Sequence, residues 1–150
     1  MDFGKSPHGP AIYRFIVCPL TPGGLQQAGA GWLDPRSAGF LSDAHALGLS
    51  QVSRIECADL FFIAGNLLEA DLQRLAHELL SDPLVQSVTW EVLAQPPTPD
   101  SASGGNCSHL LEVALRPGVT DPVAEQLVRA AHLMGIAGVQ QASTGQRFTV

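Results

Sequence analysis

The chain contains an internal repeat, which constrains its fold more than any other feature of the sequence. Residues 121–150 align with residues 34–63 without a gap, at a separation of 87 positions. The aligned pairs include Asp34-Pro35 with Asp121-Pro122, Ala44-His45 with Ala131-His132, Gly48 with Gly135, and Phe61 with Phe148. Upstream, Pro22-Gly23 aligns with Pro117-Gly118 at a separation of 95, because the first copy carries eight extra residues. The sequence therefore predicts a tandem of one small module.

The composition excludes several classes of protein. With 45% apolar and 15% charged residues, the 150-residue chain can form packed cores. Its net charge is −6, with Lys5 as the single lysine and seven scattered arginines. This argues against nucleic acid or an anionic membrane as a partner, because phosphate binding needs clustered cations. No signal-peptide core or uncharged run of membrane-helix length is present. Three cysteines, Cys18, Cys57 and Cys107, without C-x-x-C spacing, favour a reducing cytoplasm over a disulfide framework or a zinc site.

Residues 12–93 predict one complete βαββαβ unit after a loose polar leader over residues 1–11. A first strand is expected at about 12–20, followed by a helix that starts at the Asp34 N-cap and Pro35 and ends at Gly48. Strands at about 51–57 and 60–64 are expected to form a hairpin. A second helix at about 69–80 and a strand at about 85–93 complete the unit. The predicted fold is α+β, a ferredoxin-like antiparallel sheet with strand order 4-1-3-2.

Residues 94–108 predict a Pro-, Ser- and Gly-rich linker, and residues 109–150 a partial second unit. Leu111, Val113 and Leu115 alternate with more polar residues, as in a half-buried strand. A helix is expected between Asp121-Pro122 and Gly135, followed by short strands at about 139–142 and 147–150. The second unit thus has the order βαββ and lacks a second helix and a fourth strand.

The stretch His109–Val150 resembles PurS, the small subunit of bacterial and archaeal phosphoribosylformylglycinamidine synthase. The residues that carry the resemblance are Arg116, Pro117, Gly118, Asp121, Pro122, Gly135, Gly145, Arg147 and Phe148. The first copy is similar but looser. It keeps the counterparts Pro22, Gly23, Asp34, Pro35 and Phe61, with Asp59-Leu60 where a Gly-Arg type of pair would stand.

The resemblance implies a non-catalytic scaffold. Members of this family dimerise and bridge a PurQ-type glutaminase to the PurL-type ATP-dependent synthetase, helping ammonia to pass between them in purine synthesis. On this interpretation the chain binds no cofactor, and ATP and Mg²⁺ belong to the partner synthetase. A tandem would supply within one chain the pairing that single-copy members obtain by dimerising.

The residues themselves also predict that the chemistry lies elsewhere. No Gly-rich phosphate loop ending in lysine is present. Cys18 and Cys57 lie in apolar strands and are expected to be core residues. The matched pair His45 and His132 is expected to be structural rather than catalytic, because no carboxylate recurs beside both. Among the candidate interaction residues Arg116 and Arg147 are the strongest, with a solvated surface as the alternative.

Two apolar features predict partners. The first strand has apolar residues on both faces, which indicates that a second sheet packs on it, from copy two or from a second chain. In copy two, the missing helix and strand leave Leu111, Val113, Leu115 and Phe148 bare. We expect copy one, a second chain or sequence beyond Val150 to cover them, and favour the last, with this chain as the N-terminal piece of a longer synthetase.

An alternative interpretation is a tandem amino-acid sensor similar to ACT domains, which share the βαββαβ order. Those domains also place a Pro-Gly turn after the first strand, as in Leu115–Val119 here. The Asp-Pro that follows and the Gly-x-Arg-Phe strand match the synthase subunit better. A stand-alone enzyme such as an acylphosphatase would need a phosphate loop that the sequence does not contain.

Overall fold

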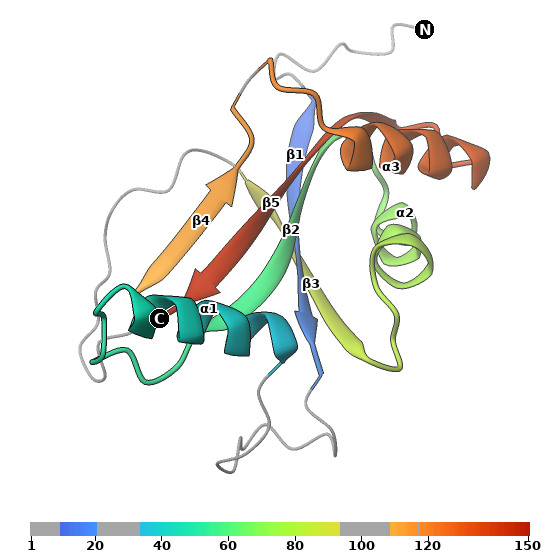
Figure 1. The fold of residues 1–150 in the computed structure, drawn as a ribbon. Coiled ribbons are helices and arrows are strands. Elements are labelled where there is room, and N and C mark those ends of the chain that lie inside the picture. Colours follow the sequence, from blue (N-terminus) through green and yellow to red (C-terminus); the bar gives the residue numbers. More distant parts are fainter. Residues whose placement is uncertain (1–9, 21–33, 94–108, 117) are drawn as a thin grey trace, which may run out of the picture.

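The computed structural model describes residues 10–20, 34–93, 109–116 and 118–150. They form one five-stranded antiparallel sheet in the order β3-β1-β2-β5-β4, with helices packed on it (Figure 1). The strands are β1 (Ala11–Pro19), β2 (Glu56–Gly65), β3 (Gln86–Leu93), β4 (Leu110–Ala114) and β5 (Val139–Thr149). The helices are α1 (Pro35–Ala46), α2 (Glu69–Arg74), which continues as the π-helical η1 (Leu75–Leu80), and α3 (Pro122–Leu133). The fold is α+β and compatible with the ferredoxin-like class.

None of the helices in the described ranges is both long enough and apolar enough to cross a membrane.

The hairpin predicted in the first half and the two short strands predicted in the second half are both wrong, because each is a single long strand. The strands expected at 51–57 and 60–64 are the ten-residue β2, and those expected at 139–142 and 147–150 are the eleven-residue β5. A tight hairpin needs residues that tolerate positive φ, such as Asn-Gly. Ala58-Asp59 offers no such pair, so the chain continues in extended form. The described first half therefore has the order βαβαβ instead of βαββαβ.

The two halves of the chain share one sheet edge to edge. β2 pairs with β5 along nearly its whole length, from Glu56 opposite Thr149 to Gly65 opposite Val139. In the expected 4-1-3-2 order, β5 takes the place next to β2 that the first copy's own second strand would have filled. The prediction that copy two packs face to face on the first strand is therefore wrong. Packing by a second chain stays a prediction.

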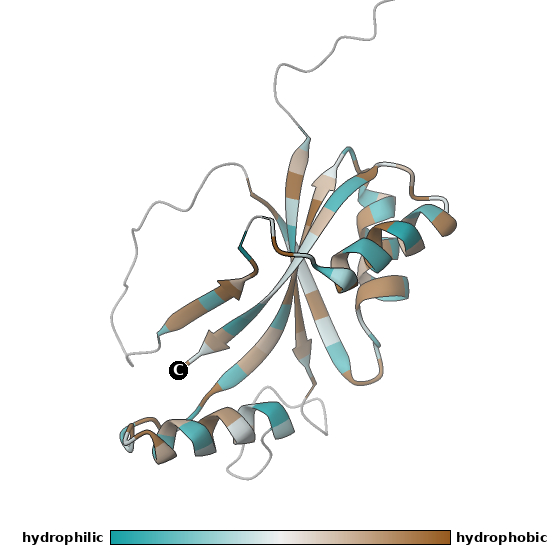
Figure 2. Ribbon diagram, turned by 45° about the horizontal axis from the view of Figure 1, so that its top comes forward, coloured by the Kyte–Doolittle hydropathy of each residue, from teal (hydrophilic) through white to brown (hydrophobic). Residues whose placement is uncertain are grey.

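The hydrophobic core lies on one face of the sheet, here called the helix face. Tyr13, Phe15 and Val17 of β1 point to this face and are buried. They belong to one cluster with Leu75 of η1 and Leu127 of α3. Helix α1 contacts the same face at its other end, where Phe40 packs edge-on against Phe148 with ring centroids 4.9 Å apart. All three helices thus lie on one side of a strongly twisted sheet (Figure 2).

Helices α1 and α3 agree in length and in the way they start. Each has 12 residues and begins with a proline that follows an aspartate N-cap. The Asp34 carboxylate accepts from the Ser37 N–H at 3.3 Å, and the Asp121 carboxylate accepts from the Ala124 N–H at 3.0 Å. Such caps satisfy N–H groups that have no partner inside a helix. The predicted helix between Asp121 and Gly135 is confirmed.

The matched histidines make the same contact at the ends of these helices. Nε2 of His45 lies 2.8 Å from the carbonyl oxygen of Val52, and Nε2 of His132 lies 2.7 Å from that of Val139. Both pairs are seven residues apart and 87 positions from each other. Each ring ties the end of a helix to the chain that follows it, since Val52 precedes β2 and Val139 is the first residue of β5. This contact favours the structural role predicted for both histidines.

Candidate functional site

The predicted interaction motif lies at the end of β4 and the start of α3. Arg116 is exposed and makes no ion pair with the described residues. The carbonyl oxygen of Arg116 accepts a hydrogen bond from the Val119 N–H at 3.1 Å. Gly118 has a φ of 87°, a backbone conformation that residues with a side chain rarely adopt. Pro117 and the counterparts Pro22 and Gly23 lie outside the described residues. Pro35 and Pro122 are the first residues of α1 and α3.

Asp121 has more hydrogen bonds than its counterpart Asp34. Besides the cap, its carboxylate accepts from the backbone N–H of Thr144 at 2.7 Å and from the Thr144 hydroxyl at 2.9 Å. Burial raises the pKa of the Asp121 carboxyl, but the hydrogen bonds from Ala124 and Thr144 outweigh burial and leave the pKa below its ordinary value of 3.8. Asp121 therefore holds α3 against β5 as well as capping it.

Asp121→Ala should lower the free energy of unfolding by about 1–2 kcal/mol at pH 7, since a cap and the contacts to Thr144 are lost. Asp34→Ala should have a smaller effect. Because the folded pKa is depressed, the stabilisation is complete above pH 3.8 and is lost as the pH falls through the folded pKa. Urea denaturation from pH 7 to pH 3 checks both points. A steeper loss of stability in acid for Asp121→Asn than for the unchanged chain would contradict this assignment.

The face opposite the helices, here called the open face, carries a cluster of four charged side chains. Arg14 of β1 bonds Glu91 of β3 and also Glu112 of β4, the latter at 2.9 Å. Glu112 in turn bonds Arg147 of β5. The two arginine side chains are mostly buried, at 18% and 17% exposure. Arg147, one of the two strongest candidates from the sequence, is therefore engaged within the protein.

The contact between Arg14 and Glu112 shows that the sheet is strongly curved. β2 and β5 lie between the strands that carry these residues. In a flat sheet, strands three places apart are separated by about 14 Å. The two residues are also offset along the strands. Arg14 lies opposite Phe62 of β2, whereas Glu112 lies opposite Arg147 of β5, which in turn lies opposite Ala58 of β2. Phe62 and Ala58 are about 13 Å apart along β2. A 2.9 Å contact therefore requires the sheet to curl with its open face concave.

Glu112→Gln should lower the free energy of unfolding by about 1–3 kcal/mol, because two partly buried guanidinium groups lose their shared carboxylate. Glu91→Gln is the matched control, since its side chain is 51% exposed. We expect that exposed pair to contribute at most about 1 kcal/mol. Urea denaturation of both variants measures the difference between their free energies of unfolding. This difference should become smaller at high salt. If both variants lowered the free energy of unfolding by the same amount, the charged cluster would not depend mainly on Glu112.

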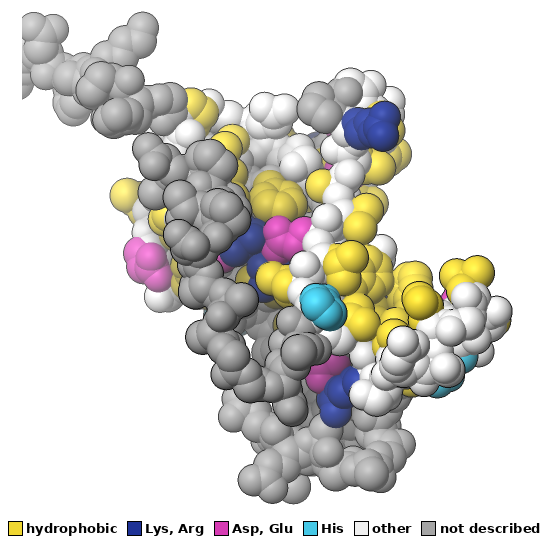
Figure 3. Space-filling model, turned by 90° about the vertical axis from the view of Figure 1, so that its left-hand side faces the viewer, with side chains coloured by type: hydrophobic (Ala, Val, Ile, Leu, Met, Phe, Trp, Pro, Cys, Tyr) yellow, Lys and Arg dark blue, Asp and Glu magenta, His cyan; other side chains and the backbone are white. Residues whose placement is uncertain are grey.

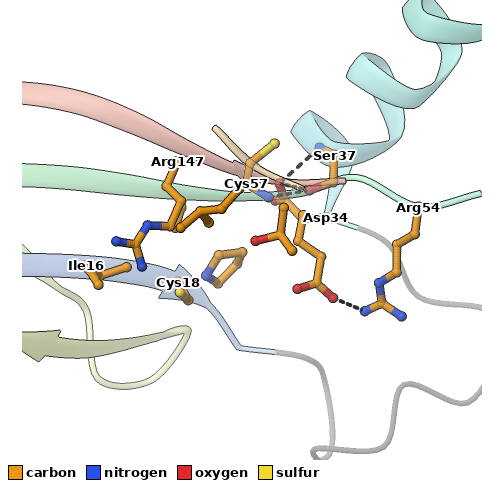
Figure 4. A pocket seen from close by; sticks show the side chains of 12 residues that line it. Ile16, Cys18, Asp34, Ser37, Arg54, Cys57 and Arg147 are labelled. Carbon is orange, nitrogen blue, oxygen red and sulfur yellow. Dashed lines mark hydrogen bonds and ion pairs between the residues drawn. The ribbon is translucent and has the colours of Figure 1, made fainter. Parts of the chain in front are cut away.

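A hollow of about 290 Å³ lies at one end of the open face, below the start of α1 (Figure 4). Its charged side chains are already paired, since Arg54 bonds Glu56 at 2.7 Å and Arg147 bonds Glu112. Burial raises the pKa of the Cys18 thiol, and the nearby Arg147 lowers it by less, so this thiol is protonated at neutral pH. The Ser37 hydroxyl accepts from the Cys57 N–H at 3.2 Å, a structural contact.

An apolar surface over β4 is left uncovered by the described residues. Figure 3 shows hydrophobic side chains gathered on the side of the molecule where β4 forms the edge of the sheet. All five residues of β4 are exposed. Their apolar neighbours on the helix face include Leu115 and Val123, which are also exposed. A hollow of about 490 Å³ runs beside them, lined by Val113, Leu115, Val123 and residues of β2 and β5. The bare surface predicted around Leu111, Val113 and Leu115 is confirmed, but Phe148, predicted to be bare with them, is half-buried and packs against Phe40.

The charged cluster on the open face was not predicted. Arg14 stands out in the sequence as the one charge inside an apolar strand, but its partners lie 77 and 98 positions away. Among the described residues, no group of three or more His, Cys, Asp or Glu side chains is arranged to hold a metal ion.

Comparisons with protein-family models, curated proteins and solved structures found no match to this chain.

Proposed function

We propose that this chain is a PurS-like, non-catalytic structural module of phosphoribosylformylglycinamidine synthase. In this role it bridges a glutaminase and an ATP-dependent synthetase. The observation that supports the proposal is a pair of helices with the same length, caps and histidine contacts, in a sheet that is joined through β2 and β5. A tandem of this kind supplies internally the pairing that single-copy members of the family obtain by dimerising.

The chemistry of the described residues supports a scaffold. The arginines that line the hollow on the open face are held by glutamates, which leaves no free cation there for a phosphate. The Cys18 thiol beside them is protonated at neutral pH. Meanwhile a broad apolar surface over β4 is left uncovered, as in proteins that bind another protein.

The test is a reconstitution with the purified glutaminase and synthetase partners. The chain alone should turn over neither formylglycinamide ribonucleotide, ATP nor glutamine. Added to both partners, it should raise glutamine-dependent product formation and leave the ammonia-dependent reaction of the synthetase unchanged, because a bridge acts on the transfer of ammonia. ATPase or glutaminase activity of the chain alone would contradict the proposal, as would an unchanged glutamine-dependent rate.

The hollow beside Leu115 bears on the amino-acid-sensor alternative. Its lining contains one charged side chain, Asp59, which is bonded to Arg36 at 2.8 Å. A bound amino acid needs partners for both its ammonium and its carboxylate groups. The described lining offers no charged partner for the carboxylate, and its one carboxylate is already bonded, so we favour the scaffold. A rise in melting temperature with one of a panel of amino acids would reverse this preference.

A further inference from the structure

The second half of the chain contains the same packing positions as the first half, without their cover. Phe15 pairs with Phe61 across β1 and β2, and Leu111 pairs with Phe148 across β4 and β5. Phe61 and Phe148 are repeat counterparts, 87 positions apart. Leu111 therefore occupies in β4 the place that Phe15 occupies in β1. By the same register, Val113 occupies the place of Val17.

The exposure of these equivalent side chains differs sharply. Phe15 is 0% exposed and Leu111 is 49% exposed, while Val17 is 1% and Val113 is 58% exposed. For the helices the difference runs the other way along the chain, because α3 packs in the cluster with Phe15 and α1 packs against Phe148 of β5. Leu127 of α3 is 6% exposed, but Phe40, its counterpart in α1, is 39% exposed. Equivalent side chains are thus buried on the side of the sheet that carries β1 and exposed on the side that carries β4.

In the first half, the buried side chains of β1 are covered by a helix and by the antiparallel strand that follows it. Leu75 and Ala76 of η1 are fully buried in the cluster that contains Phe15 and Leu127. β3 pairs with the outer edge of β1, and its Trp90 ring lies 6.0 Å from that of Phe15. Within the described ranges, β4 pairs with β5 alone. No described residue pairs with its outer edge, whose backbone N–H and C=O groups lie beside the apolar channel.

We propose that this half is a docking site for a helix–strand segment of a partner protein. The helix lies in the channel between α1 and the helix face of β4 and β5, and presents a stripe of leucine and alanine as η1 does in the first half. The strand pairs antiparallel with β4 and satisfies the free groups of its outer edge. This inference goes beyond the synthase role and holds for any partner that carries such a segment.

Charge specifies the partner strand further. In the first half, β3 brings Glu91 to Arg14 on the neighbouring strand. In the second half, Arg116 lies exposed at the end of β4 and pairs with no described carboxylate. The docked strand therefore carries an acidic residue opposite Arg116.

A second copy of the chain fits this site less well. Its α2, η1 and β3 are packed in its own first half, so they are not free to cover another molecule. Two copies joined through their β4 edges would each leave Leu111 and Val113 bare, because neither brings a helix to the channel. A separate partner provides both elements at once.

The test uses the full chain and, as the probe, a synthetic peptide of residues 66–93, the segment that covers the equivalent positions in the first half. The peptide should bind and slow amide exchange in β4 and α1. Val113→Asp in the chain should weaken binding about tenfold or more, because a charge would be buried at the centre of the interface. Val92→Asp is the matched control, since Val92 is 57% exposed and lies on β3, at the opposite edge of the sheet. It should leave binding unchanged.

Three results would overturn the proposal. The first is a peptide that does not bind, and the second is protection of β3 in place of β4. The third is a dimer of the chain alone, detected by light scattering, that Val113→Asp dissociates, because the occupant would then be a second copy. Urea denaturation of both valine variants confirms that each is folded, as expected for exposed positions.

Discussion

Phe15→Ala should lower the free energy of unfolding by about 3–5 kcal/mol, the usual range for removing a fully buried phenylalanine. Leu111→Ala, at the equivalent place in β4, should lower it by at most about 0.5 kcal/mol, since the leucine is half exposed. Phe15 packs in the cluster with Leu75 and Leu127 and faces Trp90, so its loss leaves a cavity that these neighbours cannot fill. Urea denaturation followed by circular dichroism measures both values.

The comparison between these two positions tests whether the sheet around β4, in contrast to the sheet around β1, has no helix and strand packed on it. A small domain has a total stability of about 5–15 kcal/mol, so Phe15→Ala removes a large part of it. If Leu111→Ala were as destabilising as Phe15→Ala, the face over β4 would already be covered in solution. The free chain would then self-associate or fold differently in this region.

The helices could be predicted from the sequence because their signals are local. The aspartate cap, the proline at the first position and the closing glycine of α1 lie within fifteen residues, and the same holds for α3. Each helix depends on residues that are close together in the chain, so it can be placed from the sequence alone. The bare surface around Leu111 and Val113 could also be predicted, because a repeat shows which elements its shorter copy lacks.

The strands show where sequence reasoning fails. Alternation of apolar and polar residues cannot distinguish two short strands from one long strand, and β2 and β5 are each continuous. The pairing of β2 with β5 joins residues from the two halves of the chain, which no local pattern encodes. The alignment also places Pro22-Gly23 on Pro117-Gly118, 95 positions apart, whereas the sheet makes Phe15 and Leu111 equivalent, 96 apart.

The charged cluster could not be predicted for a related reason. Arg14 meets Glu112 only because the sheet curls, and this curvature arises from the twist of five strands together. The sequence does show Glu112 and Arg147 as polar residues on strands with an apolar face, which is typical of side chains that point away from the core. It does not show that they point toward the same place.

Gly65 is the second position at which a substitution should strongly destabilise the chain, because its backbone lies close to that of Gly138. A methyl group at Gly65 would lie 2.2 Å from the carbonyl oxygen of Gly138, where the end of β2 crosses the start of β5. The same oxygen accepts the N–H of Asn66 at 3.1 Å, so the two segments cannot separate without breaking this bond. The strain would therefore fall on the pairing that joins the two halves.

Gly65→Ala should lower the free energy of unfolding by about 3 kcal/mol, at the upper end of the usual range for overpacking, because a backbone has to move. Gly39→Ala is the matched control. Gly39 lies inside α1 with no neighbouring atom within 4 Å of the added methyl group. Alanine there should stabilise the chain by about 0.5–1 kcal/mol, because glycine is the poorer helix former. Urea denaturation gives both values, and amide exchange should show faster opening of β2 and β5 in Gly65→Ala alone. An unchanged stability for Gly65→Ala would mean that the two halves are not joined at this crossing.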